Sequence, residues 1–169
     1  REIVHRLGPD GKDVQAGTFH GLAARLLRAH RFPSGTFKIL DEDDAYRVFR
    51  DLARDLDRDL DRAQIQEGYA ALMSLRDAGR EPTGDDPELV RTILPLYVAR
   101  LEELDAVDFP GLLLFLRELA MDNADLQARF MHILVDEYQD TNPVQAELVS
   151  LLGSEHGNVT AVGDPGQCI

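Results

Sequence analysis

The end of the chain carries the pattern that most limits its fold. Residues 133–135 form a short, continuous apolar run, Ile-Leu-Val, which is typical of a strand covered on both faces. A helix is predicted to begin after Asn142, because Asn can cap a helix, Pro143 suits its first position and Gln145 its third. A second strand is predicted over residues 158–162. Because a strand–helix–strand unit belongs to a parallel sheet, this segment predicts an α/β fold.

Two carboxylates, Asp136 and Glu137, directly follow the first of these strands. In parallel sheets, ligands bind at the carboxyl ends of the strands. One acid at such an edge can hold Mg²⁺, and a second can orient or deprotonate a water that attacks a nucleotide. Taken alone, the pair is equally typical of an acidic turn between a strand and a loop. The loop after the second strand ends in Gln167, whose neutral amide can bond a terminal phosphate.

The middle of the chain is predicted to be almost entirely helical. Asp41, with Asp44 three residues later, is a helix start signal. Residues 51–62 are predicted to form one amphipathic helix, in which leucines four apart face the core and Asp–Arg pairs three apart cover the outer face. We interpret that charged face as solvated rather than as a mimic of DNA. The run 112–116, Leu-Leu-Leu-Phe-Leu, is apolar on every side and predicts a buried helix.

The start of the chain is predicted to hold a short strand and then a helix. The strand is predicted over residues 14–17. Thr18 can cap the helix, which carries Leu22, Leu26 and Leu27 on one face.

Composition excludes several classes of protein. The chain has 18 Lys and Arg against 31 Asp and Glu, a net charge of −13, which argues against a generic basic nucleic-acid binder. The single cysteine, Cys168, excludes a disulfide scaffold and fits a reducing compartment, so we expect a cytoplasmic protein. No apolar run reaches about 18 residues, and the N-terminus has no signal-peptide pattern, so no membrane association is expected.

Three strings of the chain together resemble the UvrD/Rep/PcrA-like superfamily 1 DNA helicases. Residues 135–142, Val-Asp-Glu-Tyr-Gln-Asp-Thr-Asn, look like the Walker B motif of that family, usually DExQDTN. Residues 162–167, Val-Gly-Asp-Pro-Gly-Gln, look like its next motif, usually GDxxQ. Residues 16–20, Ala-Gly-Thr-Phe-His, resemble its TFH motif. Residues 39–44 and 104–109 are similar to connecting segments of its helical insert.

The resemblance implies roles at the two strand ends. Asp136 looks like the Mg²⁺ ligand, and Glu137 like the base or water-positioning residue for ATP hydrolysis. Gln167 looks like the γ-phosphate sensor that couples hydrolysis to movement on DNA. ATP and Mg²⁺ are therefore the expected cofactors, with Asp136, Glu137 and Gln167 as the cofactor-binding residues.

The resemblance also implies that Thr18, Phe19 and His20 line the path of single-stranded DNA. Each of the first two residues has an equally good alternative from the sequence itself. Phe19 fits a place in the core, and Thr18 fits a helix cap.

The fold class that the resemblance implies is α/β: a partial RecA-like, parallel-sheet P-loop NTPase core interrupted by a mostly α-helical insertion. Residues 1–32 would be the N-terminal piece of this motor core, residues 33–130 the insertion, and residues 131–169 the C-terminal piece. The phosphate-binding sequence G-x-x-x-x-G-K-[ST] does not occur in the chain. We therefore expect this chain alone to be inactive, to bind DNA weakly or not at all, and to self-associate through exposed strand edges.

The sequence thus predicts part of an ATP-dependent DNA helicase or translocase that tracks single-stranded DNA, with 3′→5′ polarity and a role in repair or recombination implied by the resemblance only. Two alternatives remain open at this point. One is a non-catalytic acidic helical interaction module or a regulatory remnant of a helicase. The other is a phosphohydrolase that uses Asp136, Glu137 and Asp164 around metal ions, although the further His and Asp ligands expected for it are missing.

Overall fold

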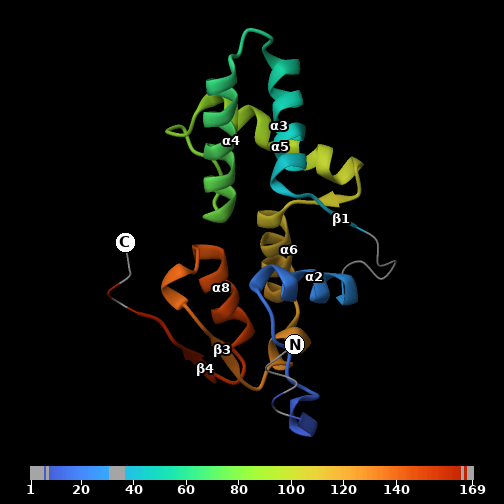
Figure 1. Cartoon of the computed structure of the whole chain (residues 1–169), viewed down its shortest axis with the longest axis vertical. Coiled ribbons are helices and arrows are strands. Elements are labelled where there is room, and N and C mark those ends of the chain that lie inside the picture. The colour runs from blue at the N-terminus through green and yellow to red at the C-terminus, as the bar shows by residue number, and fades with distance from the viewer. Residues whose placement is uncertain (1–5, 7, 31–36, 165, 167–169) are drawn as a thin grey trace.

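The computed structural model describes residues 6, 8–30, 37–164 and 166 (Figure 1). Its elements, in chain order, are η1 (Gly8–Gly11), α2 (Phe19–His30), β1 (Lys38–Ile39), α3 (Glu42–Leu56), α4 (Arg62–Asp77), α5 (Glu88–Glu103), β2 (Ala106–Val107), α6 (Phe109–Met121), α7 (Ala124–Ala128), β3 (Ile133–Val135), η2 (Tyr138–Asp140), α8 (Pro143–Leu152) and β4 (Val159–Ala161). The result is a mixed α/β structure, mostly helical, with short parallel strands.

The helices divide into two regions with separate apolar cores. In Figure 1, α3, α4 and α5 lie together at the top, and α6 lies below them between α8 and α2. The upper core joins α3, α4 and α5 and includes Phe49, Leu72, Ile93 and Tyr97, each completely buried. The lower core joins α2, α6, α7 and α8 and includes Leu27, Leu113, Leu126 and Leu148. These two sets are called the upper and lower regions below.

The predicted strand–helix–strand unit is confirmed in the lower region. β3 pairs with β4 in parallel, with Ile133 opposite Val159 and Val135 opposite Ala161, and α8 connects them. The start of α8 is the predicted capping box. Asn142 Oδ1 accepts from the Gln145 backbone N–H at 2.9 Å, and Gln145 Oε1 accepts from the Asn142 backbone N–H at 3.1 Å. These bonds satisfy two backbone N–H groups that have no partner within the helix, and they fix where the helix begins.

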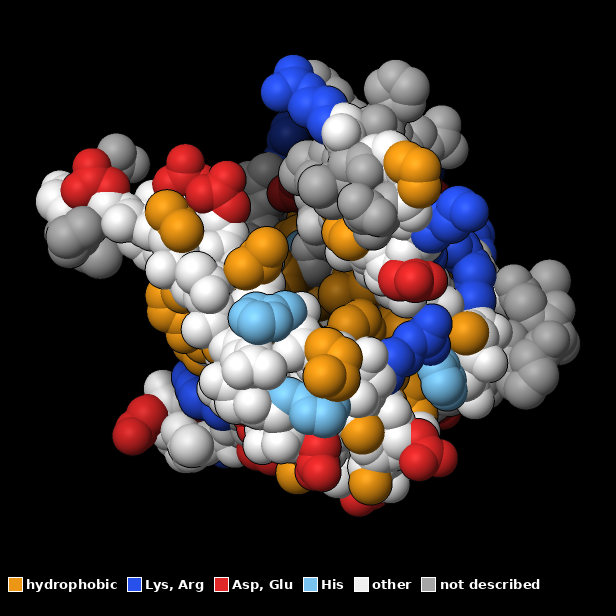
Figure 2. All heavy atoms as spheres, turned by 90° about the horizontal axis from the view of Figure 1, so that it is seen from below, with side chains coloured by type: hydrophobic (Ala, Val, Ile, Leu, Met, Phe, Trp, Pro, Cys, Tyr) orange, Lys and Arg blue, Asp and Glu red, His pale blue; other side chains and the backbone are white. Residues whose placement is uncertain are grey.

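The prediction that this sheet is covered on both faces is wrong. Side chains alternate between the two faces of a strand. Val135 is buried and Ile133 packs against the lower core, but Leu134, on the opposite face, is 76% exposed. All three residues of β4 are exposed. In the space-filling view from below, hydrophobic side chains reach the surface around a central hollow (Figure 2). Only one face of the two-stranded sheet is therefore packed within the described part of the chain.

The prediction of a single helix over residues 51–62 is also wrong. α3 ends at Leu56, and a turn follows in which the Asp57 carboxylate accepts from the backbone N–H of Asp59 at 2.9 Å. Asp61 then caps α4. Asp side chains that bond the nearby backbone compete with helical hydrogen bonds, and this competition breaks the helix after Leu56. The Asp–Arg spacing continues across the break, so charge spacing alone does not reveal it. The start predicted at Asp41 is confirmed, since its Oδ1 accepts from the Asp44 N–H at 2.8 Å.

Strands in the rest of the chain also differ from expectation. Residues 14–17 form no strand, and Val14 is 41% exposed, so the predicted strand there is wrong. Instead β1 and β2 form a short parallel pair, flanked by bonds from Lys38 N to Asp105 O and from Leu40 N to Val107 O, both 2.9 Å. This pair lies where the chain enters and leaves the upper region, and it closes the base of that region. Residues 112–116 lie in α6 within the lower core, as predicted for a buried helix.

Candidate functional site

The ends of β3 and β4 are held together by backbone hydrogen bonds that continue past the strands. Val162 N–H donates to Val135 O at 2.8 Å, and Tyr138 N–H donates to Val162 O at 2.9 Å. Because these bonds lock the two strand ends in register, the residues that follow each strand meet at one edge. We call this group the strand edge; it consists of Asp136, Glu137, Gln139, Gly163 and Asp164.

Glu137 occupies an unusual backbone conformation at this edge. Its φ of 51° and ψ of 46° lie in the left-handed region, which non-glycine residues adopt at a cost of roughly 1 kcal/mol. The backbone N–H of Glu137 donates to Asp136 Oδ1 at 3.1 Å, so the turn is stabilised by the preceding acid. Conformations of this kind cluster at functional sites, where the surrounding structure holds them in place. The side chains of Asp136 and Glu137 are both exposed.

Gln139 links the two halves of the strand edge, and the sequence analysis missed it. Its Nε2 donates to Glu137 Oε2 at 2.6 Å, and its Oε1 accepts from the Asp164 backbone N–H at 3.1 Å. A Cβ atom at Gly163 would collide with Gln139 Oε1, so glycine is needed there for the amide to reach across. The signal that points to Gln139 is an amide two residues after an acid, since one amide can bond a carboxylate and a backbone N–H together.

The loop after β4 is partly described. Asp164 Oδ1 accepts from the Gly166 backbone N–H at 2.8 Å, which forms a tight turn beyond Gly163. Gln167, predicted to sense a terminal phosphate, lies outside the described residues. Its role therefore stays a prediction.

The strand edge offers donors that fit a magnesium ion held together with a nucleotide. Mg²⁺ prefers oxygen ligands and is usually bound by one or two carboxylates plus substrate phosphates. Asp136 provides one exposed carboxylate at the end of a parallel strand, where such ions are held. Within the described residues, no group of three or more His, Cys, Asp or Glu side chains is arranged to hold a metal ion.

The structure places the predicted DNA-binding residues at the start of α2. Thr18 Oγ1 accepts from a backbone N–H three residues later at 3.2 Å, so Thr18 is a helix cap, and Phe19 packs against the lower core. His20 is half-buried and meets the Phe109 ring edge to face, with 5.3 Å between ring centroids. Burial lowers the pKa of His20, and the nearby Asp77 carboxylate partly opposes that shift. Thr18 is thus a helix cap and Phe19 packs against the core, as the two alternatives predicted. Contact with DNA stays a prediction for all three residues.

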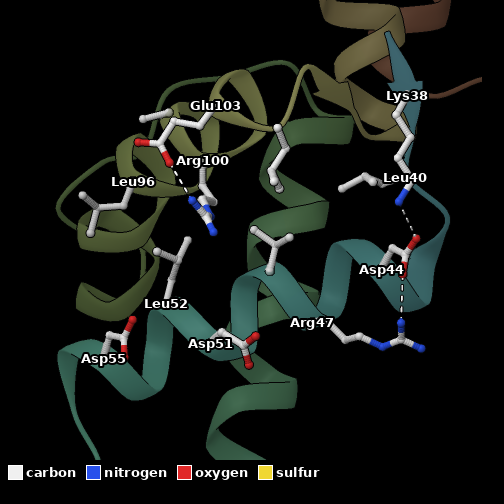
Figure 3. Close-up of a pocket in the computed structure, with 13 residues that line it drawn as sticks. Lys38, Leu40, Asp44, Arg47, Asp51, Leu52, Asp55, Leu96, Arg100 and Glu103 are labelled. Carbon is white, nitrogen blue, oxygen red and sulfur yellow. Dashed lines mark hydrogen bonds and ion pairs between the residues drawn. The ribbon is translucent and has the colours of Figure 1, made fainter.

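A groove in the upper region is distinct from the strand edge. It has a volume of about 640 Å³ and lies beside α3 and α5 (Figure 3). Asp44 accepts from Lys38 Nζ at 3.2 Å and from Arg47 Nη1 at 2.9 Å, and Arg100 pairs with Glu103 at 2.7 Å. The charged groups of the groove bond mainly to one another, whereas Asp136 and Glu137 at the strand edge are exposed. Among the helices that the structure describes, none is both long and apolar enough to cross a membrane.

Comparison with known proteins is consistent with the motifs at this edge. The family described as the UvrD/REP helicase N-terminal domain matches residues 1–169. DNA helicase II of Salmonella typhimurium (strain LT2) is 35% identical over 99% of this chain, which covers 26% of that protein. DNA helicase II of Escherichia coli (strain K12) is likewise 35% identical, with the same coverage. ATP-dependent DNA helicase PcrA of Staphylococcus aureus (strain NCTC 8325) is 30% identical over 100% of this chain, which covers 25% of that protein.

This chain spans about a quarter of the length of the curated relatives that it matches. The match to the family nevertheless extends from the first residue to the last, across both regions and the strand edge. The chain therefore belongs to the UvrD/REP helicase N-terminal domain family.

Proposed function

We propose that this chain is part of an ATP-dependent DNA helicase or translocase, in which the strand edge serves ATP hydrolysis. The observation that carries the proposal is the bridge made by Gln139, which joins Glu137 to the loop that follows β4. An acid after one strand and a polar loop after its neighbour are what a nucleotide-hydrolysing edge needs. The names of the relatives, DNA helicase II and ATP-dependent DNA helicase PcrA, support the same activity.

Asp136 and Glu137 have different roles in this proposal. Asp136 holds Mg²⁺, which supplies charge neutralisation on the phosphates. Glu137 orients the attacking water or accepts its proton. The bond from Gln139 Nε2 holds Oε2 of Glu137, and we assign the contact with the attacking water to Oε1. Fixing the carboxylate in one orientation is the contribution of the bridge, because a general base must lie within hydrogen-bond reach of the proton it takes.

The loop after β4 links hydrolysis to movement in this proposal. Gln167 senses the γ-phosphate, and a displacement of its loop reaches Glu137 through Asp164 and Gln139. Thr18, Phe19 and His20 line the path of single-stranded DNA. We further propose 3′→5′ movement, a role in DNA repair or recombination, and a cytoplasmic location, which the single cysteine favours.

We propose that the 169-residue chain by itself is inactive, because the sequence G-x-x-x-x-G-K-[ST] does not occur in it. Its net charge of −13 supports weak DNA binding or none. Exposed β4 and the 76% exposed Leu134 support self-association of the isolated chain through the sheet.

The experiment is DNA-stimulated ATP hydrolysis by the full-length protein with Glu137→Gln. This change keeps the shape of the side chain but removes the base, and general bases contribute roughly 100- to 10,000-fold. We expect kcat to fall by at least about 100-fold while binding of ATP, measured by fluorescence of a labelled nucleotide, persists. The matched control is Glu155→Gln, an exposed glutamate beyond α8 that should leave the rate unchanged. Turnover that survives Glu137→Gln would remove this function from the strand edge.

A further inference from the structure

The C-terminal end of α4 contacts the lower region at three points. Arg76 Nη2 donates to Asp108 Oδ1 at 2.7 Å, and Asp108 caps α6. Asp77 Oδ1 accepts from Asn142 Nδ2 at 3.4 Å, and Asn142 caps α8. Next to them, the Gly79 carbonyl accepts from Arg117 Nη1, on α6, at 3.0 Å. We call residues 76–79 the α4 joint.

The joint connects two regions whose apolar cores are separate, and it does so by polar contacts to both α6 and α8. Gly79 adopts a φ of +64°, and a Cβ there would lie 2.5 Å from both Arg117 Nη1 and Val144 Cγ2. The chain therefore leaves α4 in close contact with both α6 and α8. Hydrogen bonds depend on direction more strictly than apolar contacts do, so a joint of this kind fixes one orientation of α4 against the lower region.

Asp77 is the member of the joint that lies between two segments with proposed functions. They are the His20 segment, which consists of residues 18–20, and the Walker B string. Asp77 bonds the side chain of Asn142, which is the last residue of the Walker B string and is separated from Glu137 by the single turn η2.

The His20 segment reaches the same joint by contact, since the His20 ring meets the Phe109 ring edge to face and Phe109 follows Asp108, the partner of Arg76 beside Asp77. Burial raises the pKa of Asp77, and the charge of His20 partly opposes that shift. Asp108 and Arg76 are the other charged groups whose fields reach Asp77, and they act in opposite directions.

The bonds of Asn142 make this contact specific. Its Oδ1 accepts from Gln145 N–H at 2.9 Å, and its Nδ2 donates to Asp77 Oδ1. Only one orientation of the amide satisfies both bonds, because a carboxylate cannot donate and a backbone N–H cannot accept. Asp77 and the cap of α8 therefore hold each other in place.

We propose that Asp77 is a positioning residue that couples the His20 segment to the strand edge by holding Asn142 from the end of α4. The inference rests on the proposed function, since the coupling is between DNA binding and ATP hydrolysis. Its role is exerted through Asn142 and His20, and it touches neither ATP nor DNA. A displacement of His20 by DNA reaches the joint through Phe109 and Asp108, and Asp77 passes it to Asn142 at the start of α8, after η2 and Glu137.

The test compares three variants of the full-length protein by ATP hydrolysis with and without single-stranded DNA. Asp77→Leu keeps nearly the shape of the side chain but removes the oxygen that accepts from Asn142. We expect the half-saturating DNA concentration to rise roughly fivefold or more, the usual lower range of coupling between two sites, with the rate in the absence of DNA unchanged. Asn142→Asp keeps a good helix cap but sets two carboxylates against each other, and we expect a larger defect in stimulation by DNA.

The exchanged pair Asp77→Asn with Asn142→Asp is the decisive variant. It restores one donor and one acceptor at the same place with the same total charge, so stimulation by DNA should recover toward the wild-type value. The matched control is Asn123→Asp, the cap of α7, where Asn123 Oδ1 accepts from Leu126 N–H at 2.9 Å. This control should behave as the wild type does.

The outcomes separate the coupling from the proposed function. A wild-type protein with no DNA-stimulated hydrolysis would overturn the proposed function and this inference with it. With stimulation present, Asp77→Leu equal to wild type overturns the inference alone. An exchanged pair as defective as Asn142→Asp, or an equal loss of rate with and without DNA, also overturns it, because those results indicate a merely structural role. Thermal unfolding of each variant, followed by circular dichroism, identifies any change that acts through folding.

Discussion

The upper and lower regions differ in how they satisfy their backbone hydrogen bonds and bury their apolar side chains. In the upper region, three helices satisfy their own backbone hydrogen bonds and close a core around Phe49 and Tyr97, both fully buried. The lower region instead holds a two-stranded sheet whose β4 is exposed and whose Leu134 points away from the core. A helix is complete in itself, whereas a strand leaves unpaired groups unless another strand lies beside it. The difference teaches that the proposed site for ATP hydrolysis lies on the more open of the two regions.

The contact between the regions should show the largest effect on stability. Asp108 and Arg76 form an ion pair whose side chains are 1% and 8% exposed, and Tyr97 donates a third bond, to Asp108 Oδ2, at 3.1 Å. Asp108→Ala would leave the Arg76 charge buried without its carboxylate, which costs roughly 3–5 kcal/mol in the free energy of unfolding. Urea denaturation measures this loss.

The control for that prediction is an exposed pair in the upper region. Arg100 and Glu103 are 51% and 64% exposed, so Arg100→Ala should change the free energy of unfolding by less than about 1 kcal/mol. Equal effects of Asp108→Ala and Arg100→Ala would mean that the two regions are held together by something other than the buried pair.

The bridge at the strand edge should show the next largest effect, on catalysis. Gln139→Leu removes both bonds of the amide, and a base displaced by about 1 Å can lose up to about 100-fold in rate. We expect kcat for ATP hydrolysis by the full-length protein to fall at least roughly tenfold with little change in KM. Gln66→Leu, at an exposed position of α4, is the matched control. Unchanged turnover in Gln139→Leu would show that Glu137 does not depend on the bridge.

The sequence predicted local features well and distant contacts poorly. The caps at Asp41 and Asn142 and the β3–α8–β4 unit follow from residues within a few positions of each other, so they were predictable. The Arg76–Asp108 pair joins residues 32 apart, and no local pattern indicates it. The break after Leu56 was hidden because the charge repeat runs through the turn.

The strand edge shows the same distinction between local features and contacts made by distant residues. The place of Asp136 and Glu137 at the carboxyl end of a parallel strand, where ligands bind, was predictable, and their role in catalysis stays a prediction. The bridge made by Gln139 was harder to predict, because Glu137 lies two residues before it but the Asp164 backbone lies 25 residues away, and only the folded sheet brings that loop close. The open face of β3 was missed for a related reason. An apolar run indicates that both faces of a strand can be buried. It does not indicate whether the residues that would pack on each face belong to the same chain.

The electrostatics of the junction between the regions should give a smaller effect. The pKa of His20 is lowered from its ordinary 6.5, because burial disfavours the charged ring more than Asp77 favours it. The folded protein thus binds this proton less readily than the unfolded chain, so the stability due to His20 is present above pH 6.5 and is lost as pH falls from there through the lower pKa of the folded state. Asp77→Asn removes the opposing charge, and we expect the pKa of His20 to fall further, as measured by NMR titration of the ring.

The control for the titration is Asp55→Asn, at the exposed end of α3, which should leave the His20 titration as it is in the wild type. A pKa of His20 that rises or stays constant in Asp77→Asn would mean that the carboxylate does not act on the ring. The electrostatic interaction between Asp77 and His20 would then lose its support.

The smallest effect on stability is expected on the open face of the sheet. Leu134 is 76% exposed, so Leu134→Ser should change the free energy of unfolding by no more than about 0.5 kcal/mol, although it removes a large apolar side chain. Leu148→Ala, in α8 at 1% exposure, should cost roughly 2–5 kcal/mol under the same urea denaturation. Because self-association would cover Leu134, the serine variant should also sediment as a smaller species at high concentration. A loss above about 1 kcal/mol for Leu134→Ser in dilute monomer would show that this face is packed in solution, and the contrast between the two regions would then disappear.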